Sequence, residues 1–209
     1  MADEGHLTNL TSAEIIRRLS AAPFVPTDEP YPPGVLKEPL RQASVLIPLL
    51  QKDNAWHILF IRRAEHSEDI HSGQVAFPGG GAHPEDPDPE ITALREAFEE
   101  IGLEPGDVQI VGWLNEFITI SSYRVTPIVG IIPWPYSFHL DENEVSRAFT
   151  IPLDWLADPA NHSTQNRVLP PPYHPISVIY FKPYDGEILW GASARFTLGL
   201  IDILSESGE

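Results

Sequence analysis

Three carboxylates and one guanidinium lie close together in the stretch ALREAFEEIGL at residues 93–103. On a helix with 100° per residue, Glu96, Glu99 and Glu100 share one face. The apolar side chains of the stretch share the opposite face: Leu94, Ala97, Phe98 and Ile101. Neighbouring carboxylates repel each other, so this pattern calls for a compensating positive charge. Arg95 can supply part of it, and a divalent cation such as Mg²⁺ or Mn²⁺, which prefers oxygen ligands, can supply the rest. The alternative is an acidic helix face that is merely solvated.

The surrounding sequence favours the metal, because acids gather there. Residues 84–107 contain nine of the 30 acids of the chain and a single base, Arg95. These acids are Glu85, Asp86, Asp88, Glu90, Glu96, Glu99, Glu100, Glu104 and Asp107. With only 13 Lys and Arg, the chain has a formal net charge of −17 at pH 7, which argues against a non-specific nucleic-acid binder. It can still take an anionic phosphate ester if metal ions lie between the two.

Composition excludes several other kinds of chemistry. The chain has no cysteine, which removes disulfides, thiol catalysis and cysteine-based zinc sites. The run PGGG is not followed by the Gly-Lys-Ser/Thr of a P-loop, and no G-x-S-x-G motif of serine hydrolases is present. The acidic start MADEGHLTNL has no apolar signal core, and no apolar run approaches the roughly 20 residues of a membrane span. We therefore expect a cytoplasmic protein that does not associate with membranes.

Hydrophobic patterning predicts the elements that must position these residues. A helix is expected at residues 8–21, capped by Thr11 and Glu14, followed by a Pro-rich connector that reaches Pro39. Strands are expected at 43–50, 55–63, 73–77, 108–119 and 124–133, a mixed segment at 142–156, and a hairpin at 176–190. The acidic helix begins near Pro89 or Thr92, after a Gly- and Pro-rich loop, and ends at Gly102; a last helix spans 191–206. This order predicts an α+β fold with a mixed β-sheet.

Taken together, FPGG at 77–80 and REAFEEIGL at 95–103 resemble the signature of the Nudix hydrolases. That signature runs Gly, five residues, Glu, seven residues, then Arg-Glu-apolar-any-Glu-Glu-any-Gly-apolar. Gly80 matches its glycine, and residues 95–103 match its second half. Asp86 takes the place of the first acid, with eight residues instead of seven before Arg95. The resemblance implies an α/β/α sandwich with a mixed β-sheet.

The same resemblance implies hydrolysis of a nucleoside diphosphate linked to another group, by attack of water on phosphorus with Mg²⁺ or Mn²⁺ as cofactor. It implies Glu96 and Glu100 as the leading metal ligands. Glu99 would support them as a ligand and catalytic group, oriented by Arg95 through a charge-assisted bond.

Further site residues are implied around this helix. The glycines Gly79 and Gly80 would let the backbone approach the substrate closely. A general base is expected from a later loop, and Glu144 is the first candidate, with Glu142 next. An exposed loop acid without a catalytic role explains Glu144 equally well.

Residues 59–80, LFIRRAEHSEDIHSGQVAFPGG, resemble the motif of the coenzyme A pyrophosphatase branch. The matching residues are Leu59, Arg63, Ala64, Gly73, Phe77, Pro78, Gly79 and Gly80. The second arginine of that motif is absent, because its place falls near Glu68, Asp69 or Ile70, and the stretch from Arg63 to Gly73 is one residue longer. Arg63 is therefore a candidate for binding substrate phosphate, with Arg62 or His71 as a substitute for the missing arginine.

Three functions follow from these residues. The favoured one is hydrolysis of coenzyme A or acyl-coenzyme A to 4′-phosphopantetheine and adenosine 3′,5′-bisphosphate. The second keeps the chemistry but acts on ADP-ribose or a dinucleotide such as NADH. The third is a non-catalytic, nucleotide-binding regulatory module. We expect an N-terminal helix and Pro-rich arm at 1–38, a Nudix domain at 39–205 and a frayed tail at 206–209, with a homodimer expected by resemblance alone.

Overall fold

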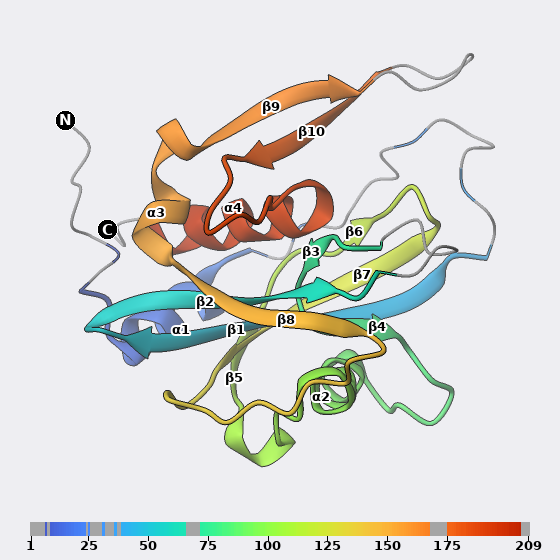
Figure 1. The fold of residues 1–209 in the computed structure, drawn as a ribbon, viewed down its shortest axis with the longest axis horizontal. Coiled ribbons are helices and arrows are strands. Elements are labelled where there is room, and N and C mark those ends of the chain that lie inside the picture. The colour runs from blue at the N-terminus through green and yellow to red at the C-terminus, as the bar shows by residue number, and fades with distance from the viewer. Residues whose placement is uncertain are drawn as a thin grey trace.

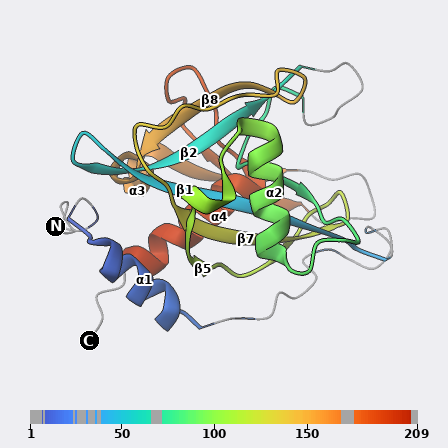
Figure 2. The same ribbon diagram turned by 90° about the horizontal axis from the view of Figure 1, so that it is seen from below.

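A mixed β-sheet forms the centre of the molecule, with helices on both faces (Figures 1 and 2). The computed structural model describes residues 7, 9–23, 25, 31, 36, 39–65, 72–167 and 175–205. Its helices are α1 (Ser12–Ala21), α2 (Pro89–Ile101), α3 (Leu153–Ala157) and α4 (Gly191–Ser205), with single 3-10 turns at Pro105–Asp107 and Pro159–Asn161. Helix α2 covers one face of the sheet, and α1, α3 and α4 cover the other. The predicted α+β sandwich is confirmed.

The sheet combines parallel and antiparallel strands. Its strands are β1 (Arg41–Lys52), β2 (Ala55–Arg63), β3 (Val75–Ala76), β4 (Gly79–Gly81), β5 (Gln109–Trp113), β6 (Phe117–Ile118), β7 (Tyr123–Ile131) and β8 (Val145–Pro152). The central pair β1 and β7 is parallel, and the other pairings are antiparallel. Strand β8 pairs with β2 at one edge of the sheet, and β5 pairs with β7 at the other. Strands β9 (His162–Arg167) and β10 (Ile176–Phe181) form a separate antiparallel ribbon.

Two apolar clusters, one on each face, hold the layers together. Leu46, Leu59 and Ile128 pack beneath α2, while Ile47, Phe60 and other residues pack towards α1, α3 and α4. Because β1 and β2 are buried on both faces, their sequences read as nearly continuous apolar runs instead of alternating patterns.

Helix α1 belongs to the core and is not a loose appendage. The predicted capping box between Thr11 and Glu14 is present, and Ile15 is fully buried. The guanidinium of Arg18 donates to the backbone carbonyl of Leu204 in α4, which closes the end of that helix. Most of the predicted Pro-rich arm, and the tail at 206–209, lie outside the described residues.

One predicted strand and one predicted loop differ from the structure. The expected strand at 108–119 is broken into β5 and β6, because the side chain of Asn115 binds the backbone N–H of Val25 and that of Glu116 turns to Arg124. The glycine run after Pro78, expected to be loop, forms the short strand β4 on β1.

The predicted hairpin at 176–190 is only partly right. Its turn is present, with positive φ at Asp185 and Gly186, but the ladder is reduced to isolated bridges. Pro183 cannot donate a ladder hydrogen bond, and β10 pairs instead with β9, which sequence patterning did not identify. The mixed segment at 142–156 resolves into β8 followed by α3.

Candidate active site

The two glycines of strand β4 lie closer to their neighbours than any other residue type allows, Gly79 to β1 and Gly80 to α2. A Cβ on Gly79 would lie 2.4 Å from the carbonyl oxygen of Ser44, and its φ of 154° is one that side chains rarely adopt. A Cβ on Gly80 would lie 2.5 Å from Oε2 of Glu96. The glycines therefore let the backbone of β4 lie directly on the acidic side of the helix.

The carboxylate of Glu100 is buried at this contact. Its residue is 1% exposed, and Oε2 accepts a 2.9 Å hydrogen bond from the backbone N–H of Gly79. Burial raises the pKa of Glu100 from its ordinary value of 4.5 to about 8, and the charges of Glu96 and Glu144 act in the same direction. The Gly79 hydrogen bond and the charge of Arg63 oppose this rise.

This burial corrects the expected orientation of the helix. The periodicity predicted that Phe98 faces the core and that Glu100 shares the exposed acidic face, but Phe98 is 46% exposed. The buried side of α2 instead carries Ala93, Ala97, Glu100 and Ile101. The small alanines allow a close approach to the sheet, and β4 covers the side on which Glu100 lies.

Arg95 links the remaining acids. Its Nη1 binds Oε1 of Glu96 at 2.9 Å and Oε2 of Glu99 at 3.0 Å. Its Nη2 binds Asp86 at 2.9 Å and the carbonyl oxygen of Gly81 at 3.0 Å, and its Nε also binds Asp86. The predicted contact between Arg95 and Glu99 is therefore present, within a wider network.

Asp86 is a central member of that network. Its carboxylate accepts both forks of Arg95, the hydroxyl of Thr92 and the backbone N–H of His83. Arg95 in particular holds the pKa of Asp86 well below its usual range. The extra residue between Asp86 and Arg95 is thus accommodated without losing the ion pair.

The other predicted residues divide into two groups. Glu144 lies just before β8, and its backbone carbonyl accepts a hydrogen bond from the N–H of Ala64. Its charge helps to raise the pKa of both Glu96 and Glu100. The charge of Arg63 also acts on Glu100. Arg62, by contrast, pairs with Glu65 and Glu187.

Glu142 lines a hollow beside β8 with Phe138 and Ser146. His71 and the acids at 68 and 69 lie outside the described residues.

A polar row on the sheet was not identified from the sequence. Gly80 pairs with Ser44, and Ser44 pairs with Thr126, so the row runs across three strands from the acidic helix. Thr126 contacts Glu116, which also binds Arg124 at 3.1 Å. Ser44 and Thr126 are nearly buried, and the signal that could have revealed them is a hydroxyl within an otherwise apolar strand.

The donor set suits a divalent cation. Glu96 and Glu99 share the guanidinium of Arg95, and Glu100 is buried where an unpaired charge is costly. Within the part of the chain that the structure describes, no three acid or histidine side chains form a ready-made ligand cluster. Arg95 binds Oε1 of Glu96 and Oε2 of Glu99, which is one oxygen of each carboxylate.

Comparison with known proteins identifies relatives along most of the chain. A family model described as the NUDIX domain matches residues 40–172. The uncharacterized Nudix hydrolase NudL of Escherichia fergusonii is 35% identical over 172 residues, covering 78% of this chain and 83% of the relative. NudL of Shigella flexneri is 34% identical over 188 residues, covering 85% and 91%.

A solved MutT/nudix family protein from Enterococcus faecalis is 13% identical, with a TM-score of 0.49 and coverage of 97% of this chain and 71% of that one. Among the described helices of the present protein, none combines the length and apolarity that crossing a membrane requires.

Proposed function

The chain belongs to the Nudix hydrolase family, and from this premise we propose that it hydrolyses coenzyme A or acyl-coenzyme A at the diphosphate. The products would be 4′-phosphopantetheine and adenosine 3′,5′-bisphosphate. The observation that carries the hydrolytic proposal is the buried Glu100 beside Glu96, a pair of acids that is costly without a cation. The coenzyme A assignment rests on the resemblance of residues 59–80 to that branch.

In this proposal, Glu96 and Glu100 hold the cation and Glu99 supports them. A bound Mg²⁺ or Mn²⁺ would neutralise the diphosphate and lower the pKa of a water molecule. Arg95 keeps Glu96 and Glu99 in place through its bonds to both, and Asp86 fixes Arg95 in turn.

Glu144 is proposed to accept the proton of the attacking water, because its charge acts on Glu96 and Glu100 from a separate segment. Arg63 is proposed to bind a substrate phosphate. Arg62 is the second candidate for that role, and its guanidinium contacts Glu65 and Glu187. Gly80 has no side chain to displace the carboxylate of Glu96, so β4 and α2 lie in direct contact at the proposed site.

The test is a substrate panel with products identified by mass. Coenzyme A, acetyl-coenzyme A, ADP-ribose and NADH are each incubated with the protein and Mg²⁺ or Mn²⁺. We expect 4′-phosphopantetheine to appear fastest, and Glu144→Gln to reduce kcat by about 10²-fold or more, the usual value of a general base. Glu104→Gln is the matched control, because it removes an exposed acid that lies beyond the end of α2.

A second candidate function is hydrolysis of ADP-ribose or a dinucleotide. The sequence favours it where Glu68 and Asp69 occupy the region of the missing arginine, since acids there repel the 3′-phosphate of coenzyme A. Faster release of AMP from ADP-ribose or NADH would support this candidate. Absence of turnover on all four compounds would favour the regulatory module.

A further inference from the structure

The C-terminal end of α2 is closed by residues 132–144, here called the β7–β8 connection, which pass the helix before they enter β8 (Figure 1). The backbone N–H of Asp141 donates to the carbonyl of Glu100 at 3.0 Å, and that of His139 donates to the next carbonyl of the helix. Carbonyls of a last helical turn have no partners within the helix, so these bonds complete α2. The β7–β8 connection is therefore bonded directly to the residue that carries the buried carboxylate of the site.

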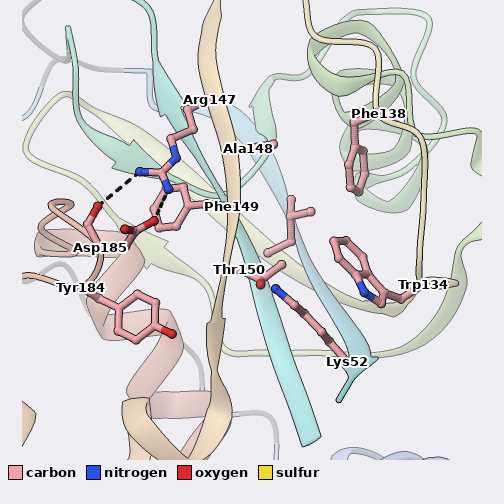
Figure 3. A pocket seen from close by; sticks show the side chains of 10 residues that line it. Lys52, Trp134, Phe138, Arg147, Ala148, Phe149, Thr150, Tyr184 and Asp185 are labelled. Carbon is pink, nitrogen blue, oxygen red and sulfur yellow. Dashed lines mark hydrogen bonds and ion pairs between the residues drawn. The ribbon is translucent and has the colours of Figure 1, made fainter. Parts of the chain in front are cut away.

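Aromatic side chains anchor the part of the connection that precedes Asp141. Trp134, Tyr136 and Phe138 pack against the apolar cluster beneath α2. The ring centroids of Tyr136 and Phe138 lie 5.1 Å apart, and Figure 3 shows Trp134 and Phe138 on the same side of β8. Asp141 thus follows a well-packed segment and begins the turn that leads to Glu144.

The backbone of Glu144 is bonded on both of its sides. Its N–H donates to the carbonyl of Asp141 at 2.9 Å, and its own carbonyl accepts from the N–H of Ala64 at 2.7 Å. The N–H of Val145 donates to the same carbonyl of Asp141 at 2.8 Å. A single residue, Asp141, therefore bonds to Glu100 through its N–H and to Glu144 through its carbonyl.

A β-bulge fixes the chain on the other side of Glu144. The pairing of β8 with β2 shifts register between Arg62 and Arg63, so that Arg63 pairs with Val145 and Ser146 becomes the extra residue. The hydroxyl of Ser146 donates to the carbonyl of Arg62 at 3.1 Å. Bulges redirect the side chains around them, and here Val145 is buried in the cluster beneath α2. The turn from Asp141 to Glu144 thus lies between two fixed points.

The side chain of Asp141 holds that turn. Its Oδ1 accepts a hydrogen bond from the backbone N–H of Asn143 at 3.0 Å and another from Nδ2 of the same residue at 2.8 Å. A carboxylate that bonds to the backbone two residues further on is a common way to fix a turn. Asp141 is half-buried, whereas the three residues that follow it are exposed. The conformation of these exposed residues therefore depends on the bonds of Asp141 more than on packing.

We propose that Asp141 is a positioning residue, which holds Glu144 at a fixed place relative to the acids of α2. Its backbone bonds join the turn to Glu100, and its carboxylate keeps the turn folded. The inference rests on the proposed hydrolysis and on Glu144 as its base, because Asp141 acts through Glu144.

The test compares Asp141→Ala with Asp141→Asn, which keeps an oxygen that can accept from Asn143. Asp158→Ala is the matched control, because Oδ1 of Asp158 accepts from the backbone N–H of Ala160 in the same way, in the turn after α3. With Mn²⁺ present, kcat and KM are measured on whichever of coenzyme A, acetyl-coenzyme A, ADP-ribose and NADH is cleaved fastest. Asp141→Ala should lower kcat by about tenfold or more with little change in KM, and the other two variants should stay close to the wild type.

A double-mutant cycle distinguishes positioning from general destabilisation. If Asp141 acts through Glu144, Asp141→Ala should change kcat by less than about twofold in the Glu144→Gln background. A merely structural role would lower kcat by the same factor in both backgrounds. If Asp141→Ala does not fold, Asn143→Ala replaces it in the cycle, since it removes the bond from Nδ2 and keeps the backbone N–H.

Hydrogen exchange provides a second measurement that needs neither substrate nor metal. The N–H groups of Glu144 and Val145, which donate to Asp141, should exchange faster in Asp141→Ala than in the wild type or in Asp141→Asn. Unchanged exchange in Asp141→Ala would show that the turn does not depend on this side chain and would overturn the inference.

The kinetic outcomes separate the inference from the proposed reaction. Equal falls of kcat in both backgrounds would overturn the inference and leave the hydrolysis intact. A wild-type kcat in Glu144→Gln would also overturn it, because Asp141 would then have no base to position. A coupled cycle measured on ADP-ribose or NADH, in a protein that does not cleave coenzyme A, would support the inference and overturn the coenzyme A assignment. A wild-type protein that cleaves none of the four compounds would overturn both.

Discussion

Replacing Glu100 with Gln should make the metal-free protein more stable while it removes activity. Glutamine keeps an oxygen that can accept the hydrogen bond from Gly79, but it carries no charge into a site that is 1% exposed. The pKa of Glu100 is raised from 4.5 to about 8. At about 1.4 kcal/mol per pKa unit, ionisation of this group costs the folded protein up to about 4 kcal/mol at pH 8.

The sign of this effect gives it a distinct pH dependence. Between pH 4.5 and 8 the folded state keeps a proton that the unfolded state has lost, so wild-type stability falls as pH rises through this window. Since 1 kcal/mol corresponds to about 2–4 °C in a protein of this size, Glu100→Gln should gain up to about 8–16 °C in Tm at pH 8 and almost nothing at pH 4.5.

The assay is thermal unfolding in EDTA from pH 4.5 to 8.5, repeated with excess Mg²⁺ or Mn²⁺. At 100 times its Kd the cation should add about 2.7 kcal/mol to the free energy of unfolding of the wild type, and so raise its Tm. It should raise the Tm of Glu100→Gln far less. Glu104→Gln removes an exposed carboxylate near the end of the same helix and should change Tm little at any pH. A difference between Glu100→Gln and wild type that is independent of pH, or of opposite sign at pH 8, would refute the reasoning.

Three further perturbations address the supporting structure. Asp86→Asn should lower kcat by about tenfold or more and destabilise the protein by about 1–3 kcal/mol, because it weakens the paired bonds to Arg95. Steady-state kinetics measures the first effect and urea unfolding the second. An unchanged kcat would contradict the positioning role of Asp86. Gly80→Ala places a Cβ against Glu96 and should raise the Mn²⁺ concentration needed for activation at least tenfold in a metal titration. If the variant gives the same titration curve as the wild type, α2 shifts to accommodate the Cβ and the reasoning is wrong. Ile15→Ala should cost about 2–5 kcal/mol of stability with kcat unchanged at 20 °C, and a loss of kcat without a loss of Tm would link α1 to the active site instead.

The ends and the charge contacts of α2 were predictable from sequence because they depend on local chemistry. Pro89 at the first turn and Gly102 in the left-handed conformation bound the helix as expected. The contact between Arg95 and Glu99 follows from their spacing of four residues, which any helix brings together.

The orientation of that helix was not predictable, because it depends on a partner distant in sequence. Periodicity assigns apolar residues to the core, and only the backbone N–H of Gly79 explains why Glu100 takes a buried position and Phe98 does not. The polar row from Ser44 to Thr126 was missed for the same reason, since a parallel pairing between β1 and β7 aligns residues that are far apart along the chain.

The contact between α1 and α4 bears on how the chain folds during synthesis. Arg18 and Leu204 are 186 positions apart, so the layer that they join cannot close until nearly all of the intervening chain has left the ribosome. Until then, the apolar side of α1 lacks its cover from α4, and long-range closures of this kind slow folding. The apolar side of α1 therefore stays exposed on the nascent chain until α4 has been synthesised. A chaperone that holds unfinished chains would be expected to bind there.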